Sequence, residues 1–222
     1  MLAIILPIIA VLIGLTFALI FKPAVNNGIK LLLSFSGAFL LSVVIFEFLP
    51  EVYSSNNSNI GIFIMLGLLI QIILEFGSKG AEHGHVHHKD EGTFPILLFL
   101  SLCSHSLIEG FPLAENQDLL LGVIVHKIPI AVILSAFLLN SKMSTIQTSI
   151  FLIIFACMTP LGAFLKTQSS ILETYSSEVN ALVVGVLLHV STTILFESSK
   201  NHQFNATKLG VILIGIVIAY FL

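Results

Sequence analysis

The stretch PILLFLSLCSHSLIEGFPLAENQDLLLGVIVHKIPIAVILSAFLLN, residues 95–140, decides the fold. It holds two apolar runs separated by a polar turn at residues 115–118. Each run approaches or exceeds the length of about 20 residues that spans a bilayer. Each is also interrupted by polar residues, at 105–110 and 126–129. Ionisable groups at membrane depth are destabilising and usually functional, so the stretch predicts a working site inside two antiparallel membrane spans.

The composition of the whole chain supports a membrane protein. Of its 222 residues, 56% are hydrophobic and only 9% are charged, whereas soluble domains carry about 25% charged residues. The net charge is −3 and the sequence has no arginine, which argues against a nucleic-acid partner. Cys103 and Cys157 lie inside apolar runs without metal-binding spacing, and we expect both to be small buried side chains.

Eight apolar segments meet the length criterion, so we predict an all-α, polytopic membrane protein with eight spans and a single domain over residues 1–222. The expected spans are Leu2–Phe21, Ile29–Leu49, Ile60–Gly77, Pro95–Ala114, Leu119–Asn140, Thr148–Leu165, Asn180–Ser198 and the short Thr207–Leu222. The first lacks the basic start and cleavage pattern of a signal peptide and is kept as a span. Close helix packing is expected at Gly67, Gly122, Gly185, Gly210 and Gly215.

The lysines predict the orientation, because short lysine-rich loops tend to stay in the cytoplasm. With both termini outside, seven lysines fall on the inner side: Lys22, Lys30, Lys79, Lys89, Lys142, Lys200 and Lys208. Lys166 alone falls outside, and Lys127 lies within a span. The outer connections are polar or acidic, which would attract cations. We therefore expect an integral membrane protein with both termini outside. The lack of a transit segment and the compact length favour a plasma membrane, of the prokaryotic inner-membrane kind.

Histidines near the middle of the bilayer are the candidate site. At about 1.5 Å per residue, His105 lies roughly 17 Å and His126 roughly 15 Å from the outer turn. Their spans are antiparallel neighbours, so the two rings can face one another. Glu109 follows His105 by four residues and shares its helix face. His189 reaches a similar depth in its own span and is a second-rank candidate.

Imidazole nitrogen and carboxylate oxygen together suit zinc, iron, cobalt or manganese better than magnesium or calcium. His105, Glu109 and His126 are therefore the candidate residues of a metal site. Buried polar side chains that merely bond across helices are the alternative reading. The metal would be a substrate, and no prosthetic group is expected.

Other polar residues could line the path of a metal ion to and from this site. A segment at about residues 78–94 is expected to be a cytoplasmic loop that receives or senses metal, because it contains His83, His85, His87 and His88. Glu47 and Glu51 lie at the outer end of the second span and could form an entrance. Glu197 and Glu75 lie at inner ends and could mark an exit.

These motifs resemble the ZIP (Zrt/Irt-like) family of divalent metal transporters. His105–Gly110 is similar to the family's H-N-x-x-[DE]-G in the fourth span, and His126–Pro129 to H-[ED]-x-P in the fifth. Glu47–Glu51 resembles the H-L-L-P-E that ends the second span, and Thr159–Gly162 a proline–glycine motif of the sixth. The resemblance implies eight spans, outside termini, and transport rather than enzymatic activity. It also implies metal ligands on spans four and five, which here are His105, Glu109 and His126, with Ser106 or solvent completing the shell.

The sequence also departs from the family pattern. Ile130 and Ala131 stand where further fifth-span ligands are common, and Thr159 stands where some members have an acid. Lys127 replaces the acid after the fifth-span histidine. One hypothesis is that its ammonium occupies the place of a second metal and pairs with Glu109 when the site is empty. The alternative is a fixed ion pair that locks the bundle and prevents transport.

Transport of a divalent metal into the cytoplasm is the favoured function, with zinc first and iron or manganese as alternatives. A non-transporting metal sensor or partner subunit is the second reading, because ligands are missing. A metal-dependent intramembrane hydrolase is the third, although the sequence offers no clear general base. The bilayer and the metal ion are the expected partners, and a homodimer is compatible with these features.

Overall fold

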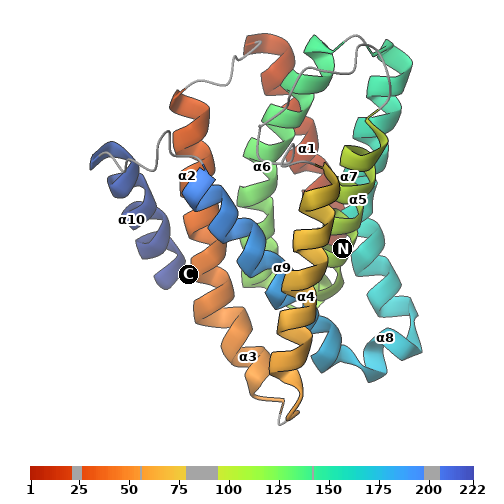
Figure 1. The fold of residues 1–222 in the computed structure, drawn as a ribbon, viewed down its shortest axis with the longest axis vertical. Coiled ribbons are helices and arrows are strands. Elements are labelled where there is room, and N and C mark those ends of the chain that lie inside the picture. The colour runs from red at the N-terminus through yellow and green to blue at the C-terminus, as the bar shows by residue number, and fades with distance from the viewer. Residues whose placement is uncertain (22–26, 56, 79–94, 142, 198–205) are drawn as a thin grey trace.

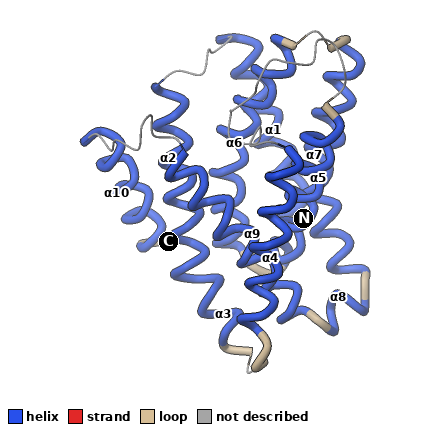
Figure 2. The backbone as a smooth tube through the Cα atoms, in the orientation of Figure 1, coloured by secondary structure: helices blue, strands red, loops and turns tan. Residues whose placement is uncertain are grey.

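The computed structural model describes residues 1–21, 27–55, 57–78, 95–141, 143–197 and 206–222 (Figure 1). Within these ranges the chain is helical with short turns and contains no strand (Figure 2). The elements are α1 (Leu2–Phe21), α2 (Asn27–Val43), the π-helical η1 (Val44–Phe48), α3 (Leu49–Tyr53), α4 (Ile60–Ser78), α5 (Ile96–Gly110), the 3₁₀ segment η3 (Phe111–Ala114), α6 (Gln117–Asn140), α7 (Thr145–Gln168), α8 (Ser170–Thr174), α9 (Ser176–Glu197) and α10 (Ala206–Tyr220).

Seven of the described helical segments are long and apolar enough to cross a membrane, with α2, η1 and α3 counted as one segment and α5 and η3 as another. The eighth, α10, has 15 residues and a length of about 22 Å. The prediction of an all-helical, polytopic membrane protein is therefore confirmed, including the shortness of the last span. Three segments differ at one or both ends by three residues or more from those expected: the second segment continues to Tyr53, α7 covers Thr145–Gln168, and α9 begins at Ser176.

The extension of the second segment has a local cause at Pro50. A proline ring clashes with the carbonyl four residues earlier, which here belongs to Phe46. The backbone avoids this clash by widening into the π-helical turn Val44–Phe48 and then resumes as α3. Glu47 lies in the widened turn and is exposed.

Helix packing places α6 at the centre of the bundle. Within the most apolar 18-residue stretch of α6, 78% of the residues are buried, whereas the corresponding share for α4 is 17%. Helix α1 packs on α6 and α7, α5 packs on α7, α4 packs on α9, and α2 contacts α6, α9 and α10. Figure 1 shows α10 at the edge of the bundle beside α2. Apolar side chains on its outer face are exposed, including Leu213 and Val217, as expected for contact with lipid.

Glycines permit several of these contacts by letting backbones approach closely. A Cβ at Gly67 would lie 1.9 Å from the carbonyl oxygen of Leu182, and one at Gly185 would lie 2.0 Å from that of Ile64. The packing role predicted for Gly67, Gly185, Gly122 and Gly215 is confirmed. For Gly210 it is wrong, because no atom of the described residues outside its own stretch of helix lies within 4 Å of the added Cβ.

Two apolar clusters enclose the middle of the α5–α6 hairpin. One contains Leu113 of η3 and Leu119 and Val123 of α6. The other contains Leu98 and Leu102 of α5 and residues 130–134 of α6. The polar residues of α5 and α6 lie between these clusters in sequence, so apolar residues flank the polar region on both sides. The fold therefore buries a polar centre away from either membrane surface.

Candidate functional site

The turn between η3 and α6 sets the register of the hairpin. Asn116 caps α6, because its Oδ1 accepts a hydrogen bond from the backbone N–H of Leu119 at 2.7 Å. Its amide nitrogen donates to Glu51 Oε2 at 2.6 Å, which ties the hairpin to the end of α3. With the turn fixed in this way, His105 on α5 and His126 on α6 become neighbours.

The geometry of the two histidines agrees with the expectation that their rings lie side by side. The ring centroids are 6.4 Å apart and the ring planes meet at 88°. Both residues are buried, with 6% and 3% of their surfaces exposed. His105 Nδ1 has no hydrogen-bond partner among the described residues. A buried ring nitrogen without a partner keeps an unused lone pair or proton, and a free lone pair is what a metal ion needs from an imidazole.

Lys127 forms the predicted ion pair with Glu109, which confirms that part of the sequence hypothesis. Its ammonium donates to Glu109 Oε1, to Ser106 Oγ at 3.2 Å and to Thr159 Oγ1 at 2.7 Å. The ammonium also lies 4.9 Å from the centroid of the Phe155 ring. All three N–H bonds of the ammonium are therefore used, and an aromatic face adds a cation–π contact.

The two carboxylate oxygens of Glu109 face different groups. Oε1 accepts from Lys127 and, at 2.8 Å, from the hydroxyl of Thr159. Oε2 lies 3.3 Å from His105 Nε2. Glu109 is 1% exposed, and the Glu109–Lys127 pair has no net charge. The carboxylate is thus divided between an ammonium side and an imidazole side.

Thr159 of α7 is a member of this cluster that the sequence did not identify as one. The motif comparison marked it only as a position without an acid. Its hydroxyl both donates to Glu109 and accepts from Lys127. A close helix crossing brings it there, since a Cβ at Gly110 would lie 2.2 Å from the Thr159 carbonyl oxygen and one at Gly162 would lie 2.1 Å from that of Leu107. The proline–glycine motif of residues 159–162 was the available signal.

The described residues contain no group of three or more His, Cys, Asp or Glu side chains placed to hold a metal ion. His105, Glu109 and His126 are brought together without being assembled into such a group. Ser106 contacts Lys127 and so does not complete a shell with His105 in this arrangement. The three-residue ligand set therefore stays a prediction.

The other predicted residues lie elsewhere or outside the described part of the chain. His189 pairs with Glu75 of α4, with 2.5 Å between Nε2 and Oε2, and thereby belongs to the α4–α9 helix pair. Glu47 and Glu51 are exposed. The side chain of Glu197 and residues 83–88 with their four histidines fall outside the described residues. Cys157 is exposed, which corrects the expectation of burial, whereas Cys103 is buried.

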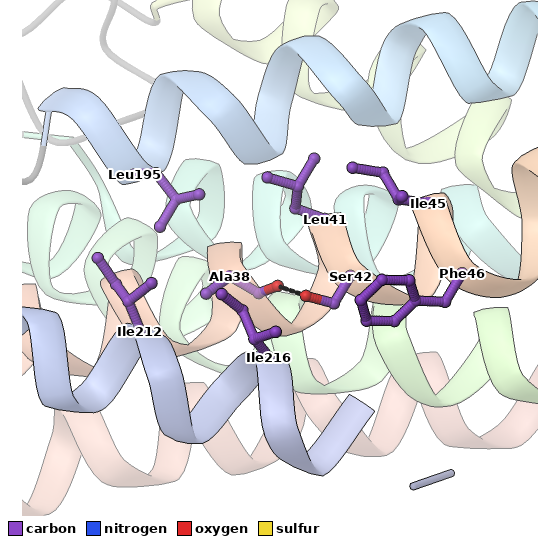
Figure 3. Close-up of a pocket in the computed structure, with 8 residues that line it drawn as sticks. All are labelled: Ala38, Leu41, Ser42, Ile45, Phe46, Leu195, Ile212 and Ile216. Atoms are coloured by element: carbon purple, nitrogen blue, oxygen red, sulfur yellow. Dashed lines mark hydrogen bonds between the residues drawn. The ribbon is translucent and has the colours of Figure 1, made fainter. Parts of the chain in front are cut away.

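A pocket of about 180 Å³ between α2, η1, α9 and α10 is separate from this cluster (Figure 3). Its lining is apolar apart from Ser42, whose hydroxyl donates to the carbonyl oxygen of Ala38 at 2.8 Å. It offers no charged or imidazole group to a metal ion, so the hairpin is the better candidate centre.

Comparison with known proteins agrees with the resemblance seen in the motifs. Residues 77–222 match the family model described as ZIP zinc transporter. Zinc transporter ZIP1 of Danio rerio is 25% identical over 144 residues, which cover 59% of this chain and 46% of that protein. The chain thus spans about half the length of this curated relative. The family consists of transporters rather than enzymes. Because the matched range covers well over half of the chain and includes the α5–α6 hairpin, the chain belongs to the ZIP zinc transporter family.

Proposed function

We propose that this chain carries a divalent transition metal ion across the membrane into the cytoplasm, with zinc as the first candidate and iron or manganese as alternatives. His105, Glu109 and His126 are the proposed ligands, and residues 1–222 are taken as one transport unit. The observation that carries this proposal is the division of Glu109, whose Oε2 faces His105 at 3.3 Å while Lys127 and Thr159 hold Oε1.

One metal ion fits the imidazole side of Glu109. The side chains on this side offer ring nitrogens and a carboxylate oxygen, which suit zinc and related metals. Small side-chain rotations would let both rings and Oε2 meet one ion, with solvent filling the remaining position. Lys127 supplies a positive charge on the other side, where a second metal would otherwise sit. A single metal per passage is therefore the expected stoichiometry.

Transport also requires the polar centre to open to each membrane surface in turn. Apolar clusters flank the polar residues of α5 and α6 on both sides, which supports a state that is closed to both membrane surfaces. The lysine distribution supports an orientation with both termini outside. A plasma membrane is the proposed location. The four-histidine segment at residues 83–88 would then receive metal on the cytoplasmic side.

A second candidate function is that of a non-transporting metal sensor or partner subunit. The observation that favours it is the complete bonding of Lys127 to Glu109, Ser106 and Thr159. An ion pair so well satisfied resists separation, because each partner would be left charged in a buried position. Metal binding without flux would identify this function.

Uptake into proteoliposomes separates the two candidates. The wild-type chain is compared with Glu109→Gln and with the double variant Glu109→Gln, Lys127→Gln, which removes both buried charges at once. Uptake of zinc, iron and manganese is followed with a metal indicator trapped inside the vesicles. Both variants should lose most of the wild-type flux, because each lacks the charged ligand.

The matched control is Glu178→Gln, which neutralises a carboxylate at the start of α9 that accepts a hydrogen bond from Asn57. It should transport like the wild type. Flux that survives in both Glu109 variants would contradict the proposed site. Metal binding by the wild type with no flux above empty vesicles would contradict transport itself and favour the sensor.

A further inference from the structure

Helix α10 runs parallel to α2 and its continuation η1, and an apolar pocket lies between them. Contacts ascend together along both segments: a Cβ at Gly215 would lie 3.3 Å from that of Ala38, and the rings of Tyr220 and Phe46 have centroids 5.7 Å apart. Leu195 of α9 also lines the pocket (Figure 3). Phe46 is 38% exposed, so the pocket reaches the surface of the bundle. Because these helices span a membrane, an acyl chain is the chemistry that fits this lining.

Two lysines lie beyond one end of this pocket, in the first turns of α2 and α10. Lys208 Nζ donates a hydrogen bond to the carbonyl oxygen of Leu195 at 2.7 Å, and the side chain of Leu195 lines the pocket. Lys30 is close enough for its charge to act on Lys208. Lys208 precedes the lining residue Ile212 by four residues and Lys30 precedes Ala38 by eight, so each lysine shares a helix face with lining residues. The positive end and the apolar pocket are therefore parts of one groove.

We propose that this groove binds an anionic phospholipid, with its phosphate at Lys30 and Lys208 and an acyl chain in the pocket. Two ammonium groups held near each other create a positive potential that attracts an anion, and basic pockets between membrane helices bind anionic lipid headgroups. The orientation expected from the lysines would put this end in the cytoplasmic leaflet, which carries such lipids. None of these residues belongs to the proposed transport site, so lipid binding here does not depend on the transported metal.

The spacing along the helices matches the depth of one leaflet. A hydrocarbon core of about 30 Å gives each leaflet about 15 Å. At about 1.5 Å per residue, Ile212 and Ile216 lie about 6 and 12 Å along the helix from Lys208, and Ala38 lies about 12 Å from Lys30. A phosphate at the two ammonium groups would therefore bring its acyl chain to the depth of the pocket. A soluble phosphate would use the lysines alone, whereas the pocket favours a phosphate that carries an acyl chain.

The test is lipid binding to the full-length chain in detergent, measured by native mass spectrometry with added phosphatidylglycerol or phosphatidylcholine. The wild type should bind phosphatidylglycerol more tightly than phosphatidylcholine. Lys30→Gln should weaken phosphatidylglycerol binding about fivefold and the double variant Lys30→Gln, Lys208→Gln about 25-fold, which is the effect of one and two lysines on the attraction to anionic lipid. Lys208→Arg keeps the charge and should bind like the wild type. The matched control is Lys142→Gln, which removes a lysine between α6 and α7 on the same expected side of the membrane.

A second variant tests the pocket separately from the lysines. Ile212→Trp places a larger side chain in the groove and leaves both ammonium groups in place, so it should lose most of the phosphatidylglycerol binding. Its control is Leu213→Trp, because Leu213 is 51% exposed on the outer face of the same helix. That variant should bind like the wild type.

The proposal is overturned if Lys30→Gln, which keeps the hydrogen bond from Lys208 to Leu195, binds phosphatidylglycerol like Lys142→Gln. It is also overturned if Ile212→Trp, shown to be folded by thermal denaturation, binds this lipid like Leu213→Trp. Equal binding of phosphatidylcholine by the wild type would contradict recognition of the phosphate charge. Displacement of the lipid by an equal concentration of glycerol 3-phosphate would identify a soluble phosphate compound as the ligand and would overturn the lipid proposal.

Discussion

Lys127 and Glu109 form an ion pair that is almost completely buried, with 3% and 1% of the two side chains exposed. The pair joins α6 to α5, and Thr159 of α7 bonds to both of its members. Three helices are thus held at one polar centre. Because a buried charge is strongly destabilising without its partner, this relationship gives the first prediction.

Removing Lys127 alone should destabilise the protein. In Lys127→Met the Glu109 carboxylate keeps its burial and loses its ammonium, and breaking a buried pair lowers the free energy of unfolding by about 3–5 kcal/mol. The double variant Lys127→Met, Glu109→Gln should recover most of that loss. Thermal denaturation of the detergent-purified single and double variants measures both effects. An equal loss of stability in the single and the double variant would contradict a destabilising effect of the unpaired Glu109 charge.

Zinc should stabilise Lys127→Met more than it stabilises the wild type. The ion can take the place of the ammonium beside Glu109, and a ligand that binds only the folded state raises its stability. The increase in melting temperature on adding zinc is compared between the two proteins, both with His83, His85, His87 and His88 changed to alanine. A larger increase in the wild type would argue against competition between Lys127 and metal.

The Thr159 hydroxyl should stabilise the folded protein and support metal flux through its two hydrogen bonds. Thr159→Val preserves the shape of the side chain and removes the group that donates to Glu109 and accepts from Lys127. Hydrogen bonds to charged groups contribute about 1.5–3 kcal/mol. We expect a loss of that order in unfolding free energy, together with reduced metal flux, and near-normal behaviour for Thr159→Ser. Wild-type stability in Thr159→Val would contradict this role.

A side chain at position 110 should destabilise the α5–α7 crossing. The added Cβ of Gly110→Ala would lie 2.2 Å from the Thr159 carbonyl oxygen, so the helices would have to separate and carry Thr159 away from the ion pair. The matched control is Gly210→Ala, where the Cβ meets no atom of another described segment within 4 Å. Alanine in a helix interior is favoured over glycine by about 1 kcal/mol, so the control should be neutral or stabilising. Melting temperatures of the two variants test this contrast.

Cysteine labelling tests the orientation that the lysines predict. In a background without Cys103 and Cys157, a cysteine is placed at Ser58, between α3 and α4, or at Thr145, at the start of α7. Both positions are exposed. A membrane-impermeant maleimide applied to intact cells should label Ser58→Cys and spare Thr145→Cys until the cells are opened. The reverse pattern would place both termini inside.

The sequence by itself determined the class of fold and the neighbourhood of the site. Apolar runs near the length of a bilayer predict spanning helices, because unsatisfied backbone groups are excluded from lipid. The short turn at residues 115–118 makes α5 and α6 antiparallel neighbours, and counting residues from that turn placed His105 beside His126. The pairing of Lys127 with Glu109 was also accessible, since opposite charges at membrane depth seek each other.

Only the tertiary structure decided which distant helices meet. Thr159 joins the ion pair because glycines let α5 and α7 approach to backbone contact, and the depth of a residue does not reveal such a contact. His189 was expected to reach a depth like that of His105 and His126, yet its partner is Glu75, because α9 packs on α4. Helix α9 also starts at Ser176, which puts His189 about 20 Å from its beginning. Local sequence sets the helices and their polar residues, whereas the packing of small residues between helices sets which of them touch.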